Sequence, residues 1–154
     1  MTQSIGDQIE HTISINADAE RVWALIRVPG WFLNGGSIVE HTIEPRNGYV
    51  VVHDADLGDF PLHTVALDPP RYAAFRWFSG RTFSSSTPLL DRSSTLIEFW
   101  ITPRGGNAVT LRVVESGFAY IGESAPKTLE LMDENSAGWV EQLAVAKRHL
   151  ETAN

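Results

Sequence analysis

Cysteine is missing from this chain of 154 residues. Without it the protein has no disulfide, no thiolate metal site and no cysteine nucleophile. Positive charge is also scarce, because 12 Lys and Arg residues stand against 19 Asp and Glu residues, for a formal net charge of -7. Since nucleic-acid binding relies on Lys and Arg to neutralise phosphate charge, we expect neither a nucleic acid nor an anionic membrane surface as a partner.

Long apolar runs are absent too. No stretch approaches the ~18 consecutive apolar residues that a membrane-spanning helix requires. The N-terminal residues MTQSIGDQIEHTI lack a basic region followed by an apolar core, so no signal peptide is evident. These absences predict a cytoplasmic protein that forms a single domain over residues 1–154.

Motifs for cofactors, metals and activated nucleophiles are equally hard to find. The sequence contains no P-loop, no GxSxG turn and no HExxH motif, and its Gly-Gly pairs do not form a dinucleotide fingerprint. Residues 54–59 begin like a calcium loop but lack the glycine spacing and the later glutamate of an EF-hand. We therefore expect no metal and no cofactor, and the motifs identify no catalytic residue.

The residues that are present alternate in a way typical of a strand-rich fold. Residues 9–15 alternate between apolar and polar, which predicts a strand with one buried face. Asp18 is a suitable N-cap for a following helix, which a Pro-Gly pair ends before a second short turn or helix. Further strands are predicted at residues 37–43, 48–54, 60–67, 72–78, 95–102 and 109–115, followed by an amphipathic helix over residues 131–154. A Ser- and Thr-rich stretch at residues 81–92 predicts a loop over a cavity mouth.

Four motifs, in this order, resemble the SRPBCC (START-like, helix-grip) superfamily. INADAERVWALI is similar to its opening strand and helix. LDPPRYAAFRW, TLIEFWITPRGGNAVTLRVVESGF and ENSAGWVEQLAVAKRHLE resemble a turn and strand, a hairpin and the closing helix of the branch named for activators of heat-shock chaperone ATPase. The resemblance implies an α+β helix-grip fold, in which a curved antiparallel sheet wraps around a long C-terminal helix. It also implies one or two short helices after the first strand, and a cavity between sheet and helix.

The strand phase predicts which side chains line that cavity. Strict alternation, counted back from the turn at Asp68, gives each strand one inner face. A β-bulge would exchange the two faces of a strand. The residues on the inner faces and the helix that we predict to contact a ligand are His63, Val65, Phe75, Trp77, Phe99, Val113, Glu115 and Trp139.

His63 and Glu115 are the two ionisable residues on these predicted faces. In a hydrophobic pocket, a carboxylate and an imidazole could polarise a carbonyl or abstract a proton, because burial shifts both pKa values toward the working pH. Alternatively, the pair orients a ligand without converting it. The plainest alternative places Glu115 near the surface at the end of its strand and makes His63 a core histidine with satisfied hydrogen bonds.

Trp100 has the opposite phase to Phe99 and is predicted to face outward. An exposed tryptophan there would fit a homodimer or another partner surface. The apolar stripe of the final helix is predicted to consist of Met132, Ser136, Trp139, Val140, Leu143, Ala146 and Leu150. Asn135 and Gln142 flank Trp139, where their amides face either a ligand or solvent.

Three functions from different classes fit these observations. The leading hypothesis is a module that binds a small apolar or aromatic molecule between sheet and helix, because the inner faces are aromatic and hold few polar residues. The second is an enzyme of cyclase, dehydratase or hydrolase type that uses His63 and Glu115. The third, a chaperone-interacting regulator, is implied by the resemblance alone. The sequence leaves open whether any reaction is catalysed.

Overall fold

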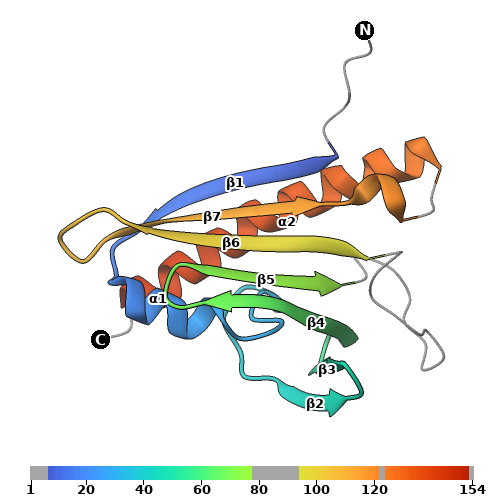
Figure 1. Ribbon diagram of the computed structural model, residues 1–154. Helices are drawn as coiled ribbons and strands as arrows, with labels where there is room; N and C mark the ends of the chain where they lie inside the picture. The colour runs from blue at the N-terminus through green and yellow to red at the C-terminus, as the bar shows by residue number, and fades with distance from the viewer. Residues whose placement is uncertain (1–6, 78–93, 122–123, 153–154) are drawn as a thin grey trace, which may run out of the picture.

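In the computed structural model, described here for residues 7–77, 94–121 and 124–152, a sheet lies across one long helix (Figure 1). The long helix is α2 (Ala125–Thr152), and a short helix, α1 (Ala19–Ile26), follows the first strand. A single 3-10 turn, η1 (Phe118–Tyr120), precedes α2. The strands are β1 (Gln8–Ile15), β2 (Thr42–Arg46), β3 (Tyr49–Asp54), β4 (Gly58–Asp68), β5 (Tyr72–Trp77), β6 (Thr95–Pro103) and β7 (Val109–Ser116).

The strands form a 7-stranded antiparallel sheet in the order β1-β7-β6-β5-β4-β3-β2. Strands β2 to β7 are a meander in which each strand pairs with the next along the chain. The first strand, β1, pairs with the last, β7, from Gln8 opposite Ser116 to Ile15 opposite Val109. With α2 packed across it, this sheet is the predicted α+β helix-grip fold, with one short helix after the first strand.

Local sequence explains most of these boundaries. The alternation in β1 is confirmed, since Ile9, His11, Ile13 and Ile15 turn away from solvent while Glu10, Thr12 and Ser14 are exposed. The side chain of Asp18 caps α1 by accepting a hydrogen bond of 2.9 Å from the backbone N–H of Arg21. This bond satisfies one of the donors left open at a helix N-terminus.

Two predicted boundaries differ from the structure. The strand expected at residues 37–43 begins only at Thr42. The chain after α1 forms turns, which is one of the two alternatives that the sequence left open. The long helix begins at Ala125, because Ser124 accepts a hydrogen bond of 3.3 Å from the N–H of Lys127 and starts it earlier. The loop predicted at residues 81–92 lies outside the described residues.

A β-bulge in β4 reverses the faces that strict alternation predicts. The pairing of β4 with β5 shifts between Thr64 and Ala66, so that Val65 is an extra residue. On the N-terminal side of the bulge, Leu62 is opposite Trp77 and is fully buried, while His63 is exposed. One inserted residue therefore turns His63 away from the helix, as a bulge does to every residue beyond it.

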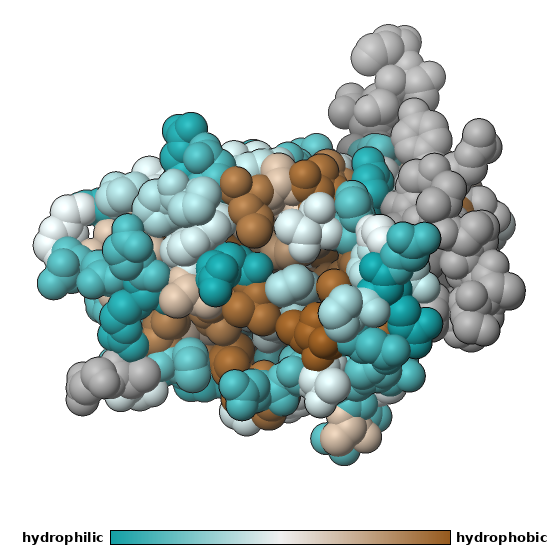
Figure 2. All heavy atoms as spheres, turned by 60° about the horizontal axis from the view of Figure 1, so that its bottom comes forward, coloured by the Kyte–Doolittle hydropathy of each residue, from teal (hydrophilic) through white to brown (hydrophobic). Residues whose placement is uncertain are grey.

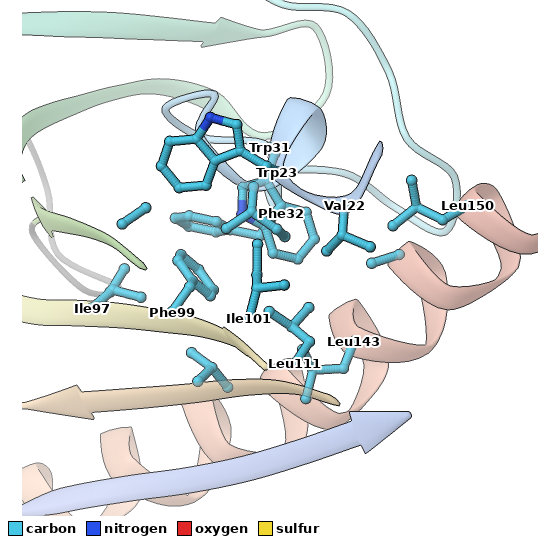
Figure 3. Close-up of a cluster of buried hydrophobic side chains, with 14 of the residues drawn as sticks. Val22, Trp23, Trp31, Phe32, Ile97, Phe99, Ile101, Leu111, Leu143 and Leu150 are labelled. Carbon is cyan, nitrogen blue, oxygen red and sulfur yellow. The ribbon is translucent and has the colours of Figure 1, made fainter. Parts of the chain in front are cut away.

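The core lies between the sheet and α2 and is centred on aromatic rings. Figure 3 shows Trp31, Phe32 and Phe99 close together, between the loop after α1 and β6. The ring centroids of Trp31 and Phe99 are 5.5 Å apart, and those of Phe32 and Phe99 are 6.2 Å apart. Each such aromatic pair contributes about 0.5–1.5 kcal/mol beyond its buried area.

Gly30 sets the position of the loop that carries two of these rings. Its φ of 78° is one that residues with a side chain rarely adopt. A Cβ there would also lie 2.9 Å from a methyl group of Val52, which a stiff β-branched side chain cannot yield easily. The glycine thus lets the loop after α1 press against β3 and deliver Phe32 to the end of the core.

On α2 the predicted apolar stripe is mostly confirmed, with one error. Met132, Trp139 and Leu143 are buried, whereas Val140 is 55% exposed because it lies a quarter-turn beyond the stripe. None of the helices in the described ranges is long and apolar enough to cross a membrane. On the underside of the view in Figure 1, apolar surface gathers in the middle and hydrophilic residues surround it (Figure 2).

Candidate functional site

Glu115 is the centre of the candidate site, because it is a carboxylate with 0% solvent exposure inside an apolar core. It lies near the end of β7, directly opposite Ile97 of β6. The alternation of β7 turns it inward together with Val113 and Leu111. The prediction that Glu115 lies on the inner face is therefore confirmed, and the alternative of a surface position is wrong.

Four side chains donate hydrogen bonds to this carboxylate. The indole N–H of Trp77 and the hydroxyl of Thr95 reach Oε2, at 2.9 and 2.5 Å. The indole N–H of Trp139 reaches Oε1 at 2.9 Å. The amide of Asn135 lies 3.1 Å from Oε1 and 3.3 Å from Oε2. Neighbouring strands and the helix therefore meet at one acidic group.

The electrostatics of this group are unusual, because no ion pair to Glu115 exists within the described residues. Burying a charge is costly unless hydrogen bonds replace its hydration. Here every partner can serve as a donor, which suits the acceptor-only form of an ionised carboxylate. Hydrogen bonds to a charged group contribute about 1.5–3 kcal/mol each, so neutral donors stand in for water around Glu115.

A pocket of about 170 Å³ opens beside this cluster. It lies between the loop after α1, the end of β5 and the middle of α2, and its lining residues are Phe32, Leu33, Trp77, Glu134, Asn135, Gly138, Trp139 and Gln142. Its walls are aromatic: the Phe32 ring lies 5.1 Å from Trp77 at 88° and 4.9 Å from Trp139. Trp77 and Trp139 thus belong both to the pocket wall and to the hydrogen-bond cluster.

Gly138 is the one glycine among the pocket's lining residues in the described chain. It lies inside α2, one residue before Trp139. A Cβ added there would meet no atom of the described chain within 4 Å, apart from the neighbouring backbone of the helix itself. No close contact therefore requires a glycine at this position.

The other predicted ligand contacts divide into two groups. Phe75, Phe99 and Val113 are buried in the core and do not appear among the residues that line the pocket. His63 and Val65 are wrongly placed by the sequence, because the bulge in β4 puts both on the outer side of the sheet. Val65 is 46% exposed, and Nδ1 of His63 donates to the carbonyl oxygen of Gly48 at 2.9 Å.

This geometry keeps His63 and Glu115 apart. One is on the outer face and exposed, and the other is fully buried on the inner face. His63 is not a core histidine either, since solvent and a loop carbonyl surround it. The structure therefore brings Glu115, Trp77 and Trp139 together and leaves the predicted imidazole out.

Sequence reasoning missed two partners that strand and helix phase would have found. Thr95 shares its alternation with Ile97 and Phe99, which places its hydroxyl on the inner face. Asn135 precedes Trp139 by four residues and so lies on the same side of the helix. Phe32 gave no such signal, because the loop that carries it has no period.

Two histidines make polar contacts on the side of β2 and β3. Nε2 of His41 is 2.9 Å from Asp54, and His53 lies between Glu44 at 3.0 Å and Asp59 at 2.7 Å. The hydrogen bonds to Asp59 and Glu44 raise the pKa of His53 above its ordinary value. In the part of the chain that the structure covers, no group of three or more His, Asp or Glu side chains is arranged to hold a metal ion.

Trp100 faces outward, as its phase predicted. The guanidinium of Arg112 lies 4.5 Å from the centre of its ring, and the Tyr72 ring is 5.3 Å away. The hydroxyl of Tyr72 donates to Glu98 at 2.6 Å. Burial and this carboxylate raise the pKa of Tyr72 far above its ordinary range.

Comparison with protein-family models gave no match, and comparison with characterised proteins gave none either. Solved structures do match. Protein MLL2253 from Mesorhizobium loti has a TM-score of 0.66 at 17% identity, over 96% of this chain and 98% of that one. The Aha1 dimer from Colwellia psychrerythraea has a TM-score of 0.63 at 15% identity, over 94% and 96%.

A third match is DynU16, described as a putative protein in the dynemicin biosynthetic locus, with a TM-score of 0.61 at 22% identity. The match covers 95% of this chain but only 48% of that one, so this chain spans about half of DynU16. Likenesses at these identities concern the fold. They support the helix-grip architecture that the strand order and the long helix display.

Proposed function

We propose that this protein, as one START-like domain, binds a small hydrophobic or aromatic molecule in the pocket between the sheet and α2. The observation that carries the proposal is Gly138. A glycine inside a helix costs roughly 1 kcal/mol relative to alanine, yet among the described residues no atom outside the helix lies within 4 Å of where a Cβ would be. The cost in helix stability is explained if the lack of a side chain at Gly138 keeps the pocket open.

The size and lining of the pocket fit a single ring. Its volume is about 170 Å³, and an apolar cavity of about 150 Å³ is large enough for benzene. Phe32, Trp77 and Trp139 supply aromatic walls, and Glu134, Asn135 and Gln142 supply the polar side chains. A mostly apolar concave site with a small number of placed polar groups is typical of ligand pockets.

The proposal is tested by filling the pocket from Gly138. Gly138→Leu extends a side chain into the open space, whereas Gly138→Ala adds one methyl group and serves as the matched control. In a titration with toluene followed by NMR, we expect the indole N–H signals of Trp77 and Trp139 to shift in the wild type and in Gly138→Ala. In Gly138→Leu they should not shift.

The same variants report on stability. Both are expected to raise the free energy of unfolding by about 0.5–1 kcal/mol, because the unfolded chain loses glycine's freedom and the helix gains a better former. Loss of toluene binding in a protein that is no less stable would isolate the pocket from the fold. Unchanged toluene binding in Gly138→Leu, or none in the wild type, would contradict the proposal.

Of the two residues in the enzyme hypothesis, His63 and Glu115, only Glu115 lies near the pocket. Glu115 lines the inner face as predicted, but His63 is on the opposite side of the sheet, so that pair does not converge on one ligand atom. A cyclase- or hydrolase-type activity would need another partner for Glu115. A chaperone-interacting role stays a prediction from the resemblance, and turnover of any ligand found would bring the enzyme hypothesis back.

A homodimer also stays a prediction, as does a cytoplasmic location. The similar Aha1 from Colwellia psychrerythraea is a dimer, and in this chain the outward Trp100 is the residue that suggested a partner surface. Sedimentation of the wild type and of Trp100→Ser would decide the point. A sedimentation coefficient of a monomer for both proteins would end the dimer hypothesis.

A further inference from the structure

We propose that the pocket selects a small organic cation, an aromatic or apolar group that carries an ammonium, over neutral and anionic molecules of the same size. This inference rests on the proposed binding function and names the chemical class of its ligand. Four features of the pocket support it: the use of its indole N–H groups, the buried charge behind it, the charge on its rim, and one unpartnered acceptor.

The indole N–H groups are already occupied. Trp77 and Trp139 each donate to Glu115 at 2.9 Å, so the surface that they offer to the pocket consists of ring carbons. Aromatic ring surfaces attract cations through their quadrupole, and tryptophan does so most strongly. With Phe32 in contact with both rings, a molecule in the pocket meets aromatic surface from three side chains.

Formal charge near the pocket is negative. The Glu115 carboxylate lies directly behind both indoles, and no ion pair among the described residues balances it. Glu134 adds a second carboxylate to the lining, while the lining contains no Lys, Arg or His among the described residues. The whole chain carries a formal charge of -7, which favours the approach of a cation.

Gln142 contributes an acceptor that has no donor. Its Nε2 donates to the carbonyl oxygen of Asn34 at 3.4 Å. The reverse orientation of the amide would set two acceptors against each other, so this contact fixes which atom is which. Oε1 is then buried and has no hydrogen-bond partner within the described residues. An unsatisfied buried acceptor is destabilising, and an ammonium N–H next to it would supply the missing donor.

An anion would meet the opposite situation. A carboxylate in this pocket would lie beside Glu134 and close to Glu115, with both indole N–H groups already donated. The side-chain amide of Asn135 is likewise directed at Glu115, and that of Gln142 donates to the carbonyl oxygen of Asn34. The lining thus opposes an anion and leaves a cation with both charge and hydrogen-bond partners.

The test compares three probes of nearly equal size: benzylamine near neutral pH, where it is a cation, benzyl alcohol, which is neutral, and benzoate, which is an anion. Dissociation constants come from the indole N–H signals of Trp77 and Trp139 in an NMR titration. We expect benzylamine to bind about tenfold more tightly than benzyl alcohol, and benzoate to bind more weakly than both. Added salt should reduce the preference for benzylamine.

Two variants separate the rim charge from the overall charge. Glu134→Gln removes a carboxylate from the lining and should reduce the preference for benzylamine roughly two- to threefold, a modest effect because solvent screens an exposed charge. Glu141→Gln makes the same charge change two turns along α2, outside the lining, and should leave the preference unchanged.

The outcomes are distinct. Benzyl alcohol binding as tightly as benzylamine, or benzoate more tightly, would overturn the cation proposal and leave the binding function standing. Failure of toluene and of all three probes to shift either indole signal would overturn both. An equal effect of Glu134→Gln and Glu141→Gln would show that overall charge, and not the pocket, creates the preference, and would also overturn the cation proposal.

Discussion

Glu115 and Glu44 are both glutamates on strands of one sheet, and the protein holds them in opposite ways. Glu115 is fully buried and accepts hydrogen bonds from neutral side chains. Glu44 leaves 45% of its side chain exposed to solvent and is paired with Arg46 and His53 at 3.1 and 3.0 Å. The buried carboxylate therefore depends on dipoles, and the exposed one on charges.

The difference shows how solvent decides what a polar contact contributes. At Glu44, water screens the charges, so ion pairs of this kind contribute little to stability. Glu115 has no solvent exposure. A buried donor that loses this carboxylate as its acceptor therefore bears the full cost of its own desolvation. The same chemical group is thus a minor surface feature in one place and an organising centre in the other.

The largest effect is expected from Glu115→Gln, which keeps the shape of the side chain but replaces one acceptor oxygen with a donor. At least one of the hydrogen-bond donors from Trp77, Thr95 and Trp139 then faces another donor. We expect the free energy of unfolding in urea to fall by about 2–4 kcal/mol. Glu44→Gln, the same change at the exposed site, should cost much less. Similar losses in the two variants would remove the contrast between the sites.

A middle-sized effect is expected from Thr95→Val, which removes one donor to Glu115 and keeps the volume of the side chain. The loss of a hydrogen bond of 2.5 Å to a charged acceptor should lower the free energy of unfolding by about 1–2 kcal/mol. Thr102→Val, at an exposed position on the same strand, is the control and should lie within about 0.5 kcal/mol of the wild type. If both variants unfold alike in urea, the Thr95 hydroxyl contributes nothing.

The smallest effect is expected at His53 and depends on pH. Hydrogen bonds to Asp59 and Glu44 raise the pKa of His53, so its folded pKa exceeds its unfolded one. The stabilisation is therefore complete below the unfolded pKa and is lost as pH rises through the folded pKa.

For Glu44 the sign is reversed. Hydrogen bonds from His53 and Arg46 lower its pKa, so its stabilisation is lost as pH falls through the folded pKa. Because the stabilisation by His53 is lost as pH rises, the difference in melting temperature between wild type and His53→Ala should shrink between pH 6 and pH 8. Added salt should shrink this difference further. A difference that grows over this range, or a folded pKa of His53 by NMR below the ordinary value of about 6.5, would contradict the prediction.

Much of the fold was predictable because alternation is a local signal. β1 and β7 keep their period without interruption, so the inward direction of Ile13 and Glu115 could be read from spacing alone. The bulge at Val65 is one residue out of register with the neighbouring strand, and nothing in β4 itself marks it. For this reason His63 was placed on the wrong face while Glu115 was placed correctly.

The partners of Glu115 were harder to predict, because they depend on which segments become neighbours. Trp77 and Trp139 each have a plain structural reason to be buried as large aromatic residues. Their shared acceptor becomes visible only when β5, β7 and α2 are assembled. Phe32 reaches the pocket through a loop whose path depends on Gly30 and its contact with Val52, which is a tertiary effect.

The carboxylate of Glu115 also has a consequence for how the protein opens. Its donors are 38, 20 and 24 residues away in sequence, on β5, β6 and α2. If one of these three segments detaches near Glu115, the buried carboxylate loses a hydrogen-bond donor that compensates for its lost hydration. Segments joined in this way tend to open as one cooperative unit and not one by one. The middle of α2 around Trp139 is therefore expected to exchange its amide hydrogens together with the end of β5 and the start of β6.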